Sequence, residues 1–119
     1  MITIDILTDP KDQTTEYLAG SENGKDMYKK YISKHEETIK KKEDLYLNFP
    51  DHIKDMTNQF SDSLLYRIAQ LGGLEYLRNH VKTNNDRINK TIQENVELMY
   101  WFTKTVNPVR LSFWLDLLY

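Results

Sequence analysis

Two short stretches and three histidines have residue types that could do chemistry. Each lacks a residue that the corresponding catalytic or binding site requires. His35-Glu36 begins like a zinc-protease helix, which needs a second histidine four residues after the first, and Ile39 occupies that position. Residues 20–26, Gly-Ser-Glu-Asn-Gly-Lys-Asp, have the glycines of a phosphate loop, but these are one residue too close and an aspartate replaces the magnesium-binding Ser or Thr. His52 and His80 stand beside no residue in the spacing of a catalytic triad. The sequence therefore predicts no catalytic residue, metal or cofactor, and we expect the chain not to be an enzyme.

A basic and aromatic stretch is a second candidate surface, because single-strand nucleic-acid platforms combine cations with stacking rings. Its tyrosines, however, share a helical face with Ile32 and Ile39 and are expected to pack inward. The chain has 16 basic and 18 acidic side chains, a net charge of -2 that opposes binding to phosphate. Nucleic acid is therefore not the expected partner. The residues of the stretch are Lys25, Tyr28, Lys29, Lys30, Tyr31 and Lys34.

Short β-branched or apolar runs predict the strands. Isoleucines alternate with polar residues over 2–6, the period of a strand. Residues 45–49, Leu-Tyr-Leu-Asn-Phe, are too short for a helix and predict a central strand. Residues 80–83 predict a brief edge strand. Residues 11–24 predict a polar connection, with an optional extended piece at 14–18.

Apolar residues at steps of three and four predict the first two helices. Residues 25–41 carry one such stripe on a helix whose other face is Lys and Glu. Residues 60–71 carry a wider stripe, and Gly72-Gly73 is typical of a helix C-cap. The conformation of residues 74–77 is left open by the pattern.

A third helix is predicted after the edge strand. Thr83 and Asp86 have the spacing of a capping box at its start. We expect it to end at Trp101 or Lys104, because Asn107-Pro108 cannot continue a helix. Its apolar stripe consists of Ile88, Ile92, Val96 and Met99.

Alternating strands and helices are typical of an α/β fold built from right-handed crossovers. The 119 residues and 14.2 kDa suit one core. We therefore expect a small mixed or parallel sheet with three helices in a domain over 1–107. Residues 108–119 form an apolar C-terminal tail.

The central segment resembles a known family. Leu-Tyr-Leu-Asn-Phe at 45–49, then Ile53, Thr-Asn-Gln-Phe-Ser-Asp-Ser-Leu-Leu at 57–65 and Gly72-Gly73 resemble the STAS-like family of unknown function, bacterial relatives of anti-sigma-factor antagonists. The family favours Asp where Asn48 stands, and Ala and Glu where serines flank the aspartate at 62. The resemblance covers most of residues 1–100. It implies a STAS-like fold and a signalling module that binds a protein partner, often a histidine-kinase-like ATPase.

The polar start of the second helix is the site that this resemblance implies. Free N–H groups and the helix dipole at such a start attract negative charge, so it favours docking or a phosphate. Among its hydroxyls, Ser61 is the best candidate phosphoacceptor, although Asp62 beside it repels a phosphate. The alternative is simple N-capping by Thr57 or Ser61. The predicted partner-binding residues are Thr57, Asn58, Gln59, Ser61, Asp62 and Ser63.

The C-terminal tail has too many contiguous apolar residues for a solvated surface. It is expected to fold back on its own domain or to pack on a second copy, with a homodimer slightly favoured. The alternative function is thus a homo-oligomeric structural or interaction protein. The predicted interface residues are Leu111, Phe113, Trp114, Leu115 and Leu118.

The absence of any apolar run long enough to span a bilayer, and of a basic leader, predicts a soluble cytoplasmic protein with no membrane partner. The chain has no cysteine, which excludes disulfides and thiolate chemistry but leaves the compartment open.

Overall fold

Three parallel strands form the centre of the computed structural model, which describes residues 1–7 and 15–105. They are β1 (Ile2–Asp5), β3 (Leu45–Asn48) and β5 (Val81–Thr83), in the order β1-β3-β5. The predicted α/β class is therefore confirmed, with β3 central and β5 at an edge. The sheet is parallel throughout, which decides between the parallel and mixed alternatives.

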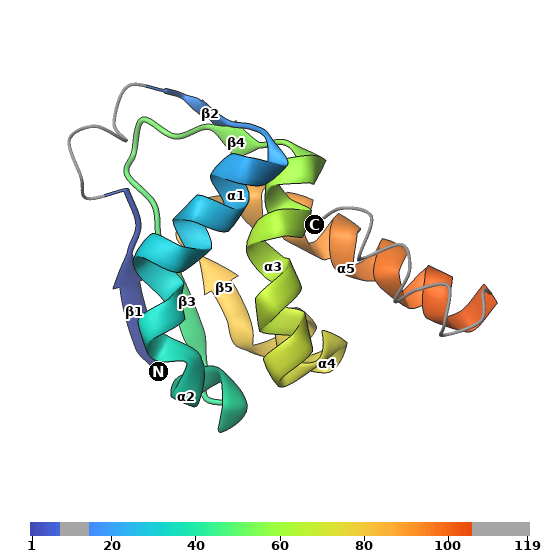
Figure 1. Ribbon diagram of the computed structural model, residues 1–119. Helices are drawn as coiled ribbons and strands as arrows, with labels where there is room; N and C mark the ends of the chain where they lie inside the picture. The colour runs from blue at the N-terminus through green and yellow to red at the C-terminus, as the bar shows by residue number, and fades with distance from the viewer. Residues whose placement is uncertain (8–14, 106–119) are drawn as a thin grey trace.

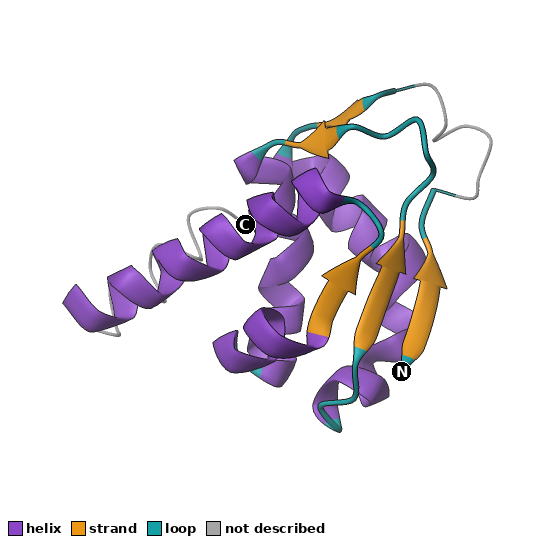
Figure 2. Cartoon of the chain, turned by 180° about the vertical axis from the view of Figure 1, so that it is seen from behind, coloured by secondary structure: helices purple, strands orange, loops and turns teal. Residues whose placement is uncertain are grey.

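Helices cover one face of this sheet. Ile4, Leu45 and Leu47 point toward that face and are at most 4% exposed. Thr3 and Asp5, on the other face, are exposed. The helices over residues 21–40 and 58–72 lie in front of the sheet in Figure 1, whereas the view from behind in Figure 2 has the strands and the long helix over 86–105 in the foreground.

A second, two-stranded parallel sheet consists of β2 (Tyr17–Leu18) and β4 (Asp55–Met56). Backbone bonds extend the pairing, because Lys54 N donates to Glu16 O at 2.7 Å and Thr57 N donates to Leu18 O at 2.8 Å. The optional extended piece at 14–18 is thus present as β2. The sequence missed β4, since a two-residue strand has too few residues to show a period.

The helix predicted over 25–41 is wrong in its start and in its regularity. It begins earlier, as α1 (Ser21–Met27), and continues through the π-helical turn η2 (Tyr28–Ile32). A 3₁₀ turn, η3 (Ser33–His35), then leads into α2 (Glu36–Lys40). The apolar stripe was nevertheless informative, because its tyrosines and isoleucines are buried.

A tyrosine in the π turn ties these segments to the next helix. Tyr28 Oη donates a hydrogen bond to the Glu36 carboxylate, which also pairs with Arg67 Nε at 3.3 Å. Burial and this hydrogen bond both raise the pKa of Tyr28. The contacts stabilise the π turn, which a regular helical pattern does not anticipate.

The second predicted helix is present as α3 (Asn58–Gly72). Thr57 Oγ1 accepts a hydrogen bond from Phe60 N at 3.2 Å and so caps it, as the N-capping alternative proposed. Gly73 ends the helix with φ of 90°, a conformation that favours glycine. The residues that the pattern left open belong to α4 (Leu74–His80), so the expected three helices were too few.

The third predicted helix is α5 (Asp86–Thr105), but the capping box was wrong. Asn85 is the residue that caps it, since Asn85 Oδ1 accepts from Ile88 N at 3.0 Å. The same side chain donates to Ile53 O at 2.9 Å. Thr83 is the last residue of β5 and is only 5% exposed, so it lies too early in the chain to act as the cap.

No helix in the described ranges is long and apolar enough to cross a membrane. The predicted tail at 108–119, with the interface residues Leu111, Phe113, Trp114, Leu115 and Leu118, lies outside the described residues.

Candidate functional site

The predicted docking segment divides into an exposed half and a buried half. Thr57, Asn58 and Gln59, at the start of α3, are exposed. The next four residues, 60–63, are all buried. The reason is that α3 packs against α1, α2, α4 and α5, which bury residues 60–65 and leave residues 57–59 in contact with solvent. Only the first three predicted residues form a surface that a partner can contact.

The predicted phosphoacceptor lies inside the fold. Ser61 is 0% exposed, and its Oγ has no hydrogen-bond partner among the described residues. Ser63 is 4% exposed, and within the described part of the chain its Oγ also lacks a hydrogen-bond partner. A kinase must reach the hydroxyl that it modifies, so this burial is the opposite of what the phosphoacceptor prediction requires.

A close helix crossing explains part of this burial. Gly24, in α1, lies so near α3 that a Cβ built on it would be 2.5 Å from Phe60 O and 2.7 Å from Ser63 Cβ. Only glycine permits this approach of the two helices. The glycine pair at 20 and 24 is thus the cap and the packing contact of α1, with Gly20 at the N-cap.

Asp62 is a buried carboxylate in the same turn. It is 8% exposed, and none of the described residues forms a hydrogen bond or ion pair with it. Burial raises its pKa from 3.8 to about 6. At neutral pH the side chain therefore carries a charge that no described residue compensates.

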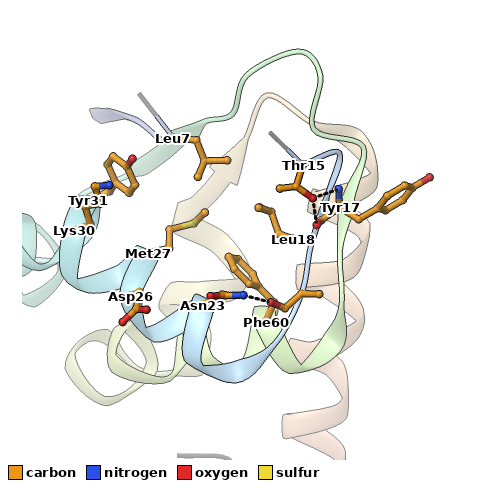
Figure 3. Close-up of a pocket in the computed structure, with 11 residues that line it drawn as sticks. Leu7, Thr15, Tyr17, Leu18, Asn23, Asp26, Met27, Lys30, Tyr31 and Phe60 are labelled. Atoms are coloured by element: carbon orange, nitrogen blue, oxygen red, sulfur yellow. Dashed lines mark hydrogen bonds between the residues drawn. The ribbon is translucent and has the colours of Figure 1, made fainter. Parts of the chain in front are cut away.

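A pocket of about 700 Å³ opens beside the exposed turn of α3. It lies between the end of β1, the β2 segment and α1, and Figure 3 shows Leu7, Leu18, Met27 and Phe60 converging on it. Its volume falls in the range of typical ligand sites. The complete lining is Leu7, Thr15, Tyr17, Leu18, Ala19, Asn23, Asp26, Met27, Lys30, Tyr31 and Phe60.

The pocket has an apolar floor and a polar rim. Leu7, with φ of 61°, is a non-glycine residue in the left-handed region, and this turn of the backbone lets its side chain line the floor. On the rim, Thr15 Oγ1 donates to Tyr17 O at 2.8 Å, and Asn23 Nδ2 donates to Ala19 O at 2.9 Å. Figure 3 shows the Tyr17 ring pointing away from the pocket.

Phe60 joins the pocket to the predicted site. It lines the pocket and follows Gln59 directly in the first turn of α3. The sequence did not reveal the pocket, because its walls come from segments that are distant in the chain. Phe60 is part of the pattern that resembles the STAS-like family, and it was the sequence signal that pointed to this region.

The other candidates form no joint site. His80 Nδ1 lies 2.6 Å from Asp44 Oδ1, at the opposite end of β3 from the pocket. The described residues contain no group of His, Asp and Glu that could hold a metal ion. Tyr28 and Tyr31 are each 7% exposed, so these rings pack inward as predicted and offer no stacking platform.

The chain matches no protein-family model, no curated protein and no solved structure. The STAS-like resemblance receives no support from these comparisons.

Proposed function

We propose that the chain is a cytoplasmic, non-enzymatic signalling adaptor of STAS-like type that binds a protein partner at the first turn of α3. The observation that carries this proposal is the pocket of about 700 Å³ that adjoins this exposed turn through Phe60. A partner segment would insert one apolar side chain into the pocket and contact Thr57, Asn58 and Gln59 with polar groups.

The energetics of such a contact favour this use. Burying one Leu or Phe side chain in an apolar pocket contributes about 1.5–3 kcal/mol, the size of an interface hot spot. The first N–H groups of a helix have no partner within the helix, and they favour a carboxylate next to the inserted side chain. The proposed partner segment therefore carries an apolar residue beside an acidic one, and a histidine-kinase-like ATPase remains the proposed class of partner.

The test compares two double variants of the whole chain in a lysate of its native host. Asn58→Arg with Gln59→Arg places bulky cations on the docking turn. Gln70→Arg with Asn79→Arg makes the same chemical change at exposed positions away from the pocket. Captured proteins are compared by quantitative mass spectrometry, and circular dichroism checks the fold.

We expect to find a protein that the wild type and the Gln70→Arg/Asn79→Arg variant capture equally. The Asn58→Arg/Gln59→Arg variant should not capture it. A third variant, Ala19→Phe, places an aromatic ring at the pocket and should lose the same protein. If the Asn58→Arg/Gln59→Arg variant is folded and still captures this protein, the proposal is wrong.

A second candidate function is a homo-oligomeric structural protein joined through its C-terminal tail. The observation that favours it is a pair of exposed apolar side chains on α5, Leu98 at 45% and Trp101 at 54%.

A further inference from the structure

Exposed lysines are concentrated on the outer side of the segments from η2 to the end of α2. Residues 29–42 carry six lysines and two glutamates, whereas the whole chain has a net charge of -2. The rest of the chain therefore has an excess of acidic side chains, and the positive charge is gathered on one surface. We call this surface the lysine face, and its exposed residues are Lys29, Lys30, Lys34, Lys40, Lys41 and Lys42.

The acidic side chains of the same segments neutralise little of the lysine face. Glu36 binds Tyr28 and Arg67, and Glu37 pairs with Lys40 at 3.4 Å. Four of the lysines have no carboxylate partner among the described residues, namely Lys29, Lys34, Lys41 and Lys42. A cluster of cations that the fold leaves uncompensated attracts a polyanion.

Lys42 occupies a backbone position that favours glycine. Its φ is 59°, in the left-handed region. Lys42 N donates to Ile39 O at 3.0 Å and Glu43 N donates to Thr38 O at 3.1 Å, the pair of bonds with which helices commonly end on a glycine. Backbone strain of this kind concentrates where a side chain has a use. The dipole of α2 favours cations at its last turn, but it does not account for the lysines of η2 and η3.

The composition of the lysine face distinguishes between classes of polyanion. A single-stranded nucleic acid needs exposed rings on which its bases stack, and Tyr28 and Tyr31 are each only 7% exposed. Paired hydrogen bonds to the phosphates of nucleic acids and to the carboxylates of a protein partner are made best by arginine, and residues 29–42 contain none. Lysine is a strongly hydrated point charge, which suits attraction to a charged surface through water.

The position of the lysine face suits a planar surface. The segments from α1 to α2 form a helical column in front of the sheet in Figure 1, and α5, with the exposed Glu94 and Glu97, lies at the back in Figure 2. The field of a charged bilayer decays over a Debye length of about 8 Å at physiological salt. A bilayer in front of the column therefore attracts the lysines and repels the acidic residues at the back only weakly.

We propose that the lysine face binds the anionic headgroups of a lipid bilayer, so that the chain lies on a membrane surface without inserting into it. Clusters of four to eight basic residues on a helix are typical of binding to phosphatidylserine, and each lysine near such a surface strengthens binding about fivefold. The expectation of no membrane partner rested on the absence of a spanning segment, which a headgroup contact does not need. The exposed turn of α3 contains none of these lysines, so the inference is independent of the proposed function.

Sedimentation of the full chain with sucrose-loaded vesicles measures this binding. The vesicles consist of phosphatidylcholine alone or of phosphatidylcholine with about one third phosphatidylserine. We expect the wild type to bind only the second kind, and less as the salt concentration rises. The lysine-face variant, which combines Lys29→Gln, Lys34→Gln and Lys41→Gln, should bind about a hundredfold more weakly, at about fivefold per lysine.

The matched control combines Lys54→Gln, Lys82→Gln and Lys90→Gln, which remove the same charge at exposed positions outside the lysine face. Its binding should weaken by less than about fivefold. Circular dichroism checks that both triple variants are folded. A wild type that does not bind the phosphatidylserine vesicles, or equal losses in the two folded variants, would overturn the proposal.

Other polyanions are tested by fluorescence anisotropy with a short double-stranded DNA and with poly-L-glutamate. We expect the wild type to bind both more weakly than the phosphatidylserine vesicles. Tighter binding to either one, lost in the lysine-face variant, would assign the face to nucleic acid or to an acidic polypeptide and contradict the lipid proposal.

Lys42→Gly separates backbone strain from lipid binding at one position. Glycine relieves the strain, so the urea midpoint of the variant should be no lower than that of the wild type. Its binding to the phosphatidylserine vesicles should weaken about fivefold, because one cation is lost. Undiminished vesicle binding by this variant would contradict the proposal that the strained lysine contacts the bilayer.

Discussion

Replacing Asp62 by asparagine should stabilise the fold at neutral pH. The carboxylate is 8% exposed and has no partner among the described residues. Burial without compensation penalises its charged form and raises its pKa from 3.8 to about 6. Asparagine has nearly the same shape and no charge, so Asp62→Asn removes this penalty and leaves the packing of α3 in place.

The size of the effect follows from the two pKa values. They differ by about two pH units, and at 1.36 kcal/mol per unit the upper limit is about 3 kcal/mol. The carboxylate keeps some contact with solvent, which screens its charge, so we expect a gain of about 1–2 kcal/mol at pH 7.5.

The sign of the pH dependence is fixed by linkage. Between pH 3.8 and about 6 the folded chain binds more protons at Asp62 than the unfolded chain does. The free energy of unfolding of the wild type therefore falls as the pH rises through this window. The free energy of unfolding of Asp62→Asn does not fall in this way. Its difference from the wild type should therefore be small at pH 3.5 and reach its full value above pH 7.

Urea unfolding followed by circular dichroism at both pH values measures this difference. Asp51→Asn makes the same substitution at an exposed position and should change the free energy of unfolding by less than about 0.5 kcal/mol. Any cost of the buried amide is the same at both pH values. An Asp62→Asn effect that does not change between pH 3.5 and 7.5 would refute the reasoning.

Two further predictions concern packing and capping, and denaturant unfolding measures both. Gly24→Ala should destabilise the fold by about 1–3 kcal/mol, because the new Cβ would lie 2.5 Å from Phe60 O; an unchanged midpoint would contradict the close helix contact. Asn85→Ala should cost about 1–2 kcal/mol through loss of the cap of α5, whereas Asp86→Ala should cost clearly less; equal losses would restore the capping box as the start signal.

The elements that the sequence predicted well have patterns that depend on near neighbours. The apolar residues at steps of three and four and the glycines at 72 and 73 predicted a helix that the structure shows as α3 (Asn58–Gly72). The pattern is local because one side of the helix must face the core at every turn. The run at 45–49, which forms β3, is apolar over most of its length, and such a short apolar run is typical of a central strand. The start of α5 was misread because two polar residues, Thr83 and Asn85, were both suitable caps. Thr83 pairs in the sheet as the last residue of β5, so Asn85 caps the helix. Strand pairing depends on residues distant in the sequence and could not be read from the local pattern.

The candidate site depended on contacts that the sequence does not reveal. The pattern at 57–63 marked a polar helix start, but Ser61 and Ser63 are buried because other helices surround α3. Gly24 was a local signal of this packing, but the sequence pattern placed it in the polar connection over 11–24. The pocket needs Leu7 and Leu18 to meet Phe60, which only the assembled fold brings about.

Asp62 also decides how far the proposed docking site extends into the fold. A buried carboxylate without a partner lowers stability, and groups of this kind concentrate where a protein uses them. If the partner binds Asp62 after local opening of α3, Asp62→Asn should make the chain more stable and its partner binding weaker. If the site consists only of Thr57, Asn58 and Gln59, the same variant should gain stability with unchanged binding. Measuring both quantities on this one variant therefore separates a surface contact from a site that reaches into the buried turn.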